Sequence, residues 1–62
     1  MKRTAFLKYI YAHGCRLDRE GGSHTLYKNP FNGKKSAIPR HIELPDTLCN
    51  TICKQLGIEK IK

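Results

Sequence analysis

His24, which follows two glycines and a serine, is the residue in this chain best suited to acid–base chemistry. It opens an alternating segment in which His24 and Lys28 share one strand face, while Thr25 and Tyr27 share the other. An imidazole titrates at about pH 6.5 and exchanges a proton near neutrality, and an ammonium group can hold a phosphate. Because RNA carries its own nucleophile, the 2′-hydroxyl, its cleavage needs only proton transfer and charge stabilisation. This pair of residues therefore suits RNA cleavage.

Several neighbours of His24 could bind the phosphate of such a substrate. The turn before it offers backbone amides, and glycine lets a phosphate approach closely. The guanidinium of Arg40 could hold a phosphate through two parallel hydrogen bonds. The RNA contacts that we expect are Gly22, Ser23, Lys28, Arg40 and His41.

A single catalytic histidine must act as base and acid in turn, or share the work with a second group. The candidates for that group are His41, Lys28 and Tyr27, and we favour His41 because it lies at the exit of a strand antiparallel to that of His24. The sequence does not give the hairpin register that would bring the two histidines together.

The patterning predicts five elements that position these residues, in the order helix, three strands, helix. Apolar residues three and four apart predict the helices, and alternation predicts the strands. The expected ranges are Thr4–His13, Cys15–Arg19, Thr25–Lys28, Lys35–Ile38, and Pro45 or Asp46 to Leu56. Both helices must bury a stripe, so we expect one α+β domain over residues 1–62, with two helices on one face of a three-stranded antiparallel sheet. The other face is left for solvent or a ligand.

Several positions should set the ends and faces of these elements. Gly14 and Gly57 should end the helices in the left-handed conformation. Asn29 to Gly33 should form a hairpin loop. Asp46 could accept hydrogen bonds from the first amides of the last helix, and the tail after Ile58 should fray. In the first strand, alternation places one set of side chains on a common face: Cys15, Leu17 and Arg19.

The charge balance favours a polyanionic partner. The 62-residue chain has 12 Lys plus Arg against 5 Asp plus Glu, a formal net charge of +7. Nucleic acid fits this charge, and so does an acidic protein. No stretch is long enough to span a membrane. The three cysteines form no close CxxC pair, so we expect free thiols in a cytoplasmic protein.

A metal site is not expected, because the histidines and cysteines of the chain show no recognised ligand spacing. Cys49 and Cys53 lie four apart on an apolar helix stripe, where small buried thiols are common. We therefore expect no metal and no small-molecule cofactor.

A set of short motifs runs from end to end of the chain: Gly14, Gly22-Ser23-His24, Tyr27, Asn29-Pro30, Pro39-Arg40-His41, Thr47-Leu48 and Leu56-Gly57-Ile58. In their order and spacing they resemble the HicA family of small mRNA-interferase toxins. The resemblance implies a double-stranded-RNA-binding-like fold and a type II toxin–antitoxin toxin, an endoribonuclease that cleaves mRNA and arrests growth. It also implies neutralisation by a HicB-type antitoxin that covers the active face. The catalytic histidine of the family corresponds to His24, and members often carry a second histidine where this chain has Thr25.

Two alternatives from other functional classes stay open. A basic RNA-binding domain would contact phosphates and 2′-hydroxyls without cleaving RNA. An inhibitor or adaptor would use the basic face to dock an acidic partner. His24 discriminates between a binder and a nuclease, because its removal should abolish turnover only in a nuclease.

Overall fold

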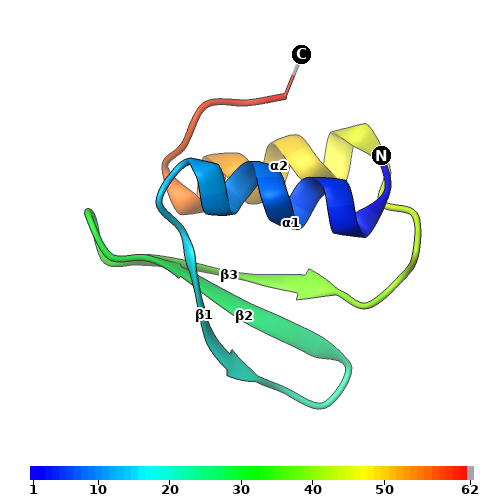
Figure 1. The fold of residues 1–62 in the computed structure, drawn as a ribbon, viewed down its shortest axis with the longest axis horizontal. Coiled ribbons are helices and arrows are strands. Elements are labelled where there is room, and N and C mark those ends of the chain that lie inside the picture. The colour runs from blue at the N-terminus through cyan, green and yellow to red at the C-terminus, as the bar shows by residue number, and fades with distance from the viewer. Residues whose placement is uncertain (62) are drawn as a thin grey trace.

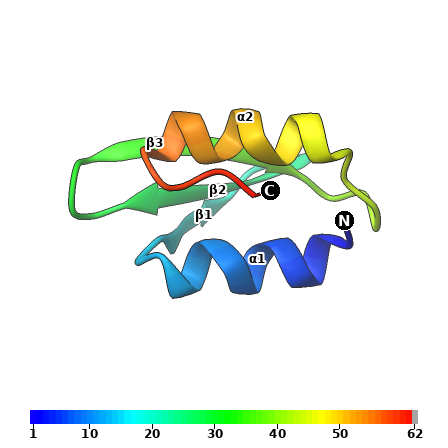
Figure 2. The ribbon, with the colours of Figure 1, turned by 90° about the horizontal axis from the view of Figure 1, so that it is seen from above.

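The computed structural model describes residues 1–61 and confirms the predicted order of elements. The helices are α1 (Arg3–Ala12) and α2 (Asp46–Leu56), and the strands are β1 (Arg16–Glu20), β2 (His24–Asn29) and β3 (Lys34–Pro39). The strands form one antiparallel sheet in the order β1-β2-β3. Both helices lie on one face of the sheet, and the other face is uncovered (Figures 1 and 2). The α+β fold predicted from patterning is therefore confirmed.

The core lies between the helices and the sheet. Its fully buried members are Phe6, Ile10, Cys15, Ile38, Leu44, Cys49, Ile52, Cys53 and Leu56. All three cysteines are free. Burial raises the pKa of each thiol above its ordinary value, so the cysteines stay protonated at neutral pH. They therefore act as small apolar core residues, as predicted for the two in α2.

The two helix-ending glycines adopt the expected left-handed conformation. Gly14 has φ 94° and Gly57 has φ 71°. The predicted cap at the other end of α2 is wrong, since no side chain donates or accepts a capping hydrogen bond there. The carboxylate of Asp46 instead lies 3.5 Å from the amino group of Met1. The positive chain terminus attracts this carboxylate away from the free amides of the helix.

The loop between β2 and β3 is fixed to the end of α2. The side-chain amides of Asn29 and Asn32 both donate to the carbonyl of Leu56, at 2.9 and 3.1 Å. The last carbonyls of a helix have no partner within the helix, and these amides supply one. Asn29 also accepts a hydrogen bond from the amide of Phe31, at 3.0 Å. Asn29 therefore joins the sheet to the last helix.

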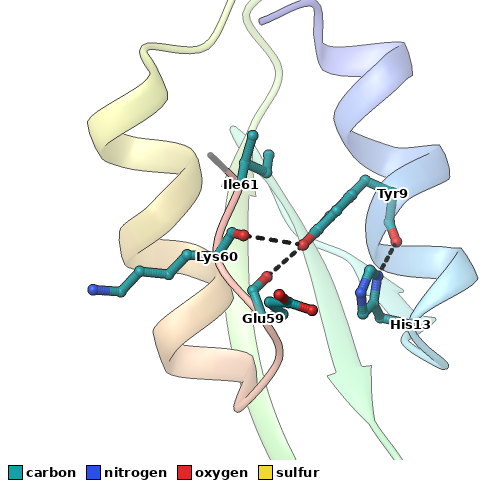
Figure 3. A pocket seen from close by; sticks show the side chains of 5 residues that line it. All are labelled: Tyr9, His13, Glu59, Lys60 and Ile61. Carbon is teal, nitrogen blue, oxygen red and sulfur yellow. Dashed lines mark hydrogen bonds between the residues drawn. The ribbon is translucent and has the colours of Figure 1, made fainter.

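The C-terminal tail lies between the two helices, so the predicted fraying is wrong for residues 59–61; Lys62 lies outside the described residues. The Tyr9 hydroxyl, from α1, donates to the carbonyl of Glu59 at 2.6 Å (Figure 3). The amide of Ile61 donates to Asn50 Oδ1 at 2.8 Å. Ile58 and Ile61 pack against the core, and this apolar burial holds the tail in place.

Candidate active site

The alternation of β2 separates a buried face from an open face, as predicted. Thr25 and Asn29 are buried, and Tyr27 packs against the core beneath the helices. His24 is exposed, and the pleat places it on the opposite face together with Lys28. The two lie four positions apart, about 13 Å along the strand. The structure thus brings His24 and Lys28 to one uncovered surface, but not into contact.

Ser23 lies against the imidazole of His24, with its Oγ 3.1 Å from Nδ1. If Nδ1 carries the proton and donates it to the hydroxyl, Nε2 has a lone pair and can accept a proton. In the imidazolium that forms, both ring nitrogens carry protons, so Nδ1 still donates to the hydroxyl while Nε2 can release its proton. The hydroxyl therefore suits both roles that one histidine must fill in turn.

The turn that leads into His24 is held by Arg40. The backbone amide of Gly21 donates to the carbonyl of His24 at 2.8 Å. The guanidinium of Arg40 donates to the carbonyl of Gly21 at 2.7 Å and to the carboxylate of Glu20. In this structure the guanidinium of Arg40 thus ties the segment after β3 to the turn before β2.

A second set of bonds fixes the residue after His24. The hydroxyl of Thr25 donates to Oε1 of Glu20 at 3.1 Å and accepts from Nη2 of Arg3 at 2.9 Å. Arg3 also donates through Nε to the carbonyl of Pro39 at 2.9 Å. Thr25 is therefore a buried structural residue, and the backbone of His24 is positioned from α1, β1 and the end of β3.

The two glycines of the turn differ in the room around them. A Cβ added to Gly21 would lie 3.0 Å from the carbonyl oxygen of His24, whereas one added to Gly22 would meet no atom within 4 Å. Neither is among the glycines with positive φ. Gly21 is thus constrained by the turn, while Gly22 leaves space that a phosphate can enter.

The structure forms no hydrogen bond between His41 and His24, or from His41 to any other part of residues 1–61. The register pairs His24 with Pro39, so His41 lies two residues beyond the end of β3. The carbonyl of Ile42 accepts a hydrogen bond from the amide of Arg3 at 2.8 Å, which draws this segment toward α1 and away from the open face. Of the three candidates for the second acid–base group, Lys28 alone shares the face of His24.

A β-bulge in β1 changes the face on which Arg19 lies, and the alternation prediction is wrong there. Leu17 pairs with Tyr27 but Arg19 pairs with Leu26, because the register shifts between them. The extra residue is Asp18. Tyr27 and Leu26 face opposite sides of β2, so the bulge moves Arg19 to the open face.

Lys28 is flanked by a cation on each neighbouring strand, Arg16 on β1 and Lys35 on β3. The guanidinium of Arg16 turns back onto the ring of Tyr11, 3.8 Å from its centroid. The ammonium of Lys35 lies 3.5 Å from the carboxylate of Asp18. Within residues 1–61, Lys28 has no ion-pair partner.

Two pockets of the molecule lie away from His24. One opens beside α1 and is lined by Leu7, Lys8, Tyr11 and Tyr27. Another is bounded by the C-terminal tail and α1, where His13 Nδ1 lies 2.9 Å from the carbonyl of Tyr9 (Figure 3). His24 is itself exposed and lines neither of these pockets, and such an open surface suits a polymer more than a small molecule.

Residues 1–61 contain neither a metal-ligand cluster nor a helix able to span a membrane. No group of three His, Cys, Asp or Glu side chains there is arranged to hold a metal ion. In the same part of the chain, neither helix has the length and apolar character needed to cross a bilayer.

Comparison with known proteins finds one family. The model of a family described as HicA toxin of bacterial toxin–antitoxin matches residues 4–58, from the first turn of α1 to the residue after the cap of α2. No curated protein and no solved structure matches the chain.

Proposed function

The chain belongs to the family of HicA toxins of bacterial toxin–antitoxin systems, and we propose that this toxin is a single-domain endoribonuclease that cleaves mRNA with His24 as its catalytic residue. The observation that carries the proposal is the placement of His24, exposed on the uncovered sheet face with Ser23 at its Nδ1. The net charge of +7 supports a polyanionic substrate. The cytoplasm, where mRNA is found, also suits the three free thiols.

In the proposed mechanism, Nε2 of His24 takes the proton of a 2′-hydroxyl, and the freed oxygen attacks the adjacent phosphorus. The bond to the 5′-oxygen breaks, and that leaving oxygen takes a proton from the imidazolium. The products are a 2′,3′-cyclic phosphate and a 5′-hydroxyl. The amides of Gly22 and Ser23 stabilise the charge that develops on the scissile phosphate, and Lys28, farther along the same face, holds a neighbouring phosphate. No metal is required, because the nucleophile belongs to the substrate.

The segment after β3, which is drawn toward α1, extends the proposed RNA surface past the edge of the open face. Arg40 and His41 are exposed and follow directly on Pro39, which pairs with His24. We assign them to contacts with RNA beyond the scissile phosphate. For Arg40 this role is additional to its bonds with the turn.

Substitution of His24 tests the proposal. Loss of a general acid–base group lowers cleavage by about 10²- to 10⁴-fold, so His24→Ala should cleave poorly and still bind RNA. The measurement is cleavage of an unstructured RNA in excess EDTA, together with a binding titration and analysis of the new ends. His13→Ala is the matched control, because His13 is exposed on the helix side of the molecule.

Three results would contradict parts of the proposal. Equal cleavage by His24→Ala and the wild-type chain would remove His24 from the mechanism. Products that end only in 3′-hydroxyls would exclude the cyclic intermediate. Binding by all three proteins, with cleavage by none, would favour the non-catalytic RNA-binding domain.

We also propose that a HicB-type antitoxin neutralises the toxin by covering His24. A toxin of this family has an antitoxin, and the open face offers exposed positive charge to an acidic partner. Coexpression with the protein encoded beside the toxin should yield a complex in which RNA cleavage is blocked. A complex that cleaves RNA at the rate of the free toxin would rule out occlusion.

A further inference from the structure

Arg19 lies diagonally across from His24 on the open face. It pairs with Leu26, and His24 and Lys28 stand two residues to either side of Leu26 on β2. Diagonal neighbours of this kind have Cα atoms about 7–8 Å apart, a distance that an arginine side chain spans. One guanidinium can therefore reach a phosphate held over Leu26, beside the imidazole of His24.

Arg19 differs from the other arginines in what its guanidinium contacts. Arg3 donates to Thr25 and Pro39, as described above. The remaining two are engaged as well, Arg16 by backbone carbonyls and Arg40 by the turn. Within residues 1–61, the exposed guanidinium of Arg19 forms no hydrogen bond and no ion pair. It is the arginine whose donors are free to bind a ligand.

The positive charges near Arg19 are poorly compensated by the protein. Lys28 stands directly between Arg16 and Lys35 across the three strands, and like charges in opposed positions destabilise a sheet. Asp18 offsets this repulsion at Lys35, and the Arg16 guanidinium is turned onto Tyr11 and bonded to backbone carbonyls, so within residues 1–61 it is Lys28 that has no compensating group. A bound anion would relieve the rest. A phosphodiester suits the site because a guanidinium fork matches two phosphate oxygens and an ammonium can hold a neighbouring phosphate.

We propose that Arg19 and Lys28 form the phosphate-binding site of the toxin, with Arg19 on the scissile phosphate beside His24 and Lys28 on the next phosphate of the strand. The proposal rests on the ribonuclease function proposed above. The new element is Arg19, which we assign to contact with the reacting phosphate. Strand alternation alone places Arg19 on the helix-covered face, and the bulge places it on the open face.

The test compares Arg19→Gln, Arg19→Lys and the control Lys54→Gln, whose ammonium is exposed on α2. Binding is measured with RNA bearing 2′-O-methyl groups, which cannot be cleaved, over a range of salt concentrations. Arg19→Gln should lower the salt slope of log K by about 0.7, the value for one lost contact to a single strand. It should also lower kcat for unmodified RNA by about 10²-fold. Arg19→Lys should keep the salt slope and regain part of the rate, and Lys54→Gln should change neither.

Failure of this inference is distinguishable from failure of the ribonuclease proposal. If the wild-type chain cleaves RNA and Arg19→Gln behaves like Lys54→Gln, the function stands and the Arg19 site is overturned. If nothing is cleaved but Arg19→Gln reduces the salt slope, the phosphate site stands without catalysis. If the wild-type chain does not bind the methylated RNA, the site is overturned outright. Equal loss of binding to polyglutamate would also overturn it, in favour of an acidic protein segment as the occupant.

Discussion

At one end of β2 the loop 30–33 is fixed to α2, whereas at the other end the turn 21–23 is held at Gly21 and leaves Gly22 and Ser23 exposed to solvent. Both segments contain glycine. The amide of Asn32 in the first segment, with that of Asn29 at the end of β2, is used within the fold, since both donate to the carbonyl of Leu56. Beyond the second, the imidazole of His24 is bonded only to its neighbour Ser23 within residues 1–61. Amino-acid composition thus identifies a turn, but the role of the turn depends on whether the rest of the chain supplies hydrogen-bond partners for its polar groups.

Of the substitutions at the two ends of β2, Asn29→Ala is expected to lower the free energy of unfolding the most. Asn29→Ala removes a buried amide that serves both α2 and the loop, so the free energy of unfolding should fall by about 1–3 kcal/mol. Denaturant unfolding measures the loss. RNA cleavage well below the unfolding midpoint should be unchanged. If Asn29→Ala cleaved RNA more slowly but kept its stability, the end of β2 that is fixed to α2 would take part in the chemistry.

A smaller effect is expected from the two glycines at the open end. Gly21→Ala places a methyl group against the carbonyl of His24, which should cost about 1–2 kcal/mol of stability and displace the imidazole. Gly22→Ala meets no protein atom, so it should leave stability unchanged and raise KM by obstructing the phosphate. Unfolding curves measure the stability loss expected for Gly21→Ala, and steady-state cleavage kinetics measure the raised KM expected for Gly22→Ala. Equal stability of the two variants would show that the turn tolerates movement.

The smallest effect is expected at Ser23. Ser23→Ala removes one hydrogen bond to the imidazole, worth about 0.5–1.5 kcal/mol, so kcat should fall roughly 2- to 10-fold while KM and stability hold. Ser23→Thr keeps the hydroxyl and should restore the rate. A rate in Ser23→Ala equal to that of the wild-type chain would show that the hydroxyl does not position His24.

Local patterning was enough to predict the elements and the two faces of β2. The apolar stripe of α2 repeats with the period of a helix, and the residues after His24 alternate with the period of a strand. Each helix and strand begins and ends within one residue of the range predicted from the sequence. The family motif also singled out His24, although its catalytic role is still a prediction. The patterning signals depend only on neighbours along the chain.

What patterning missed depends on contacts between distant segments. The bulge at Asp18 exists because two residues of β1 oppose one of β2, and alternation carries no signal for such an insertion. The position of Asp46 depends on the amino terminus, and the path of the tail depends on Tyr9. The bonds of Arg40 with Glu20 and Gly21 cross the sheet in the same way.

The bulge at Asp18 also bears on self-association. With three strands, β1 and β3 are both edges, and a flat apolar edge is a template on which another chain can add a strand. A bulge distorts such a template, and charged side chains dominate the exposed β1, while β3 ends in Pro39, which lacks an amide donor. The irregularity that turns Arg19 toward the open face thereby also discourages two copies of the chain from joining their sheets.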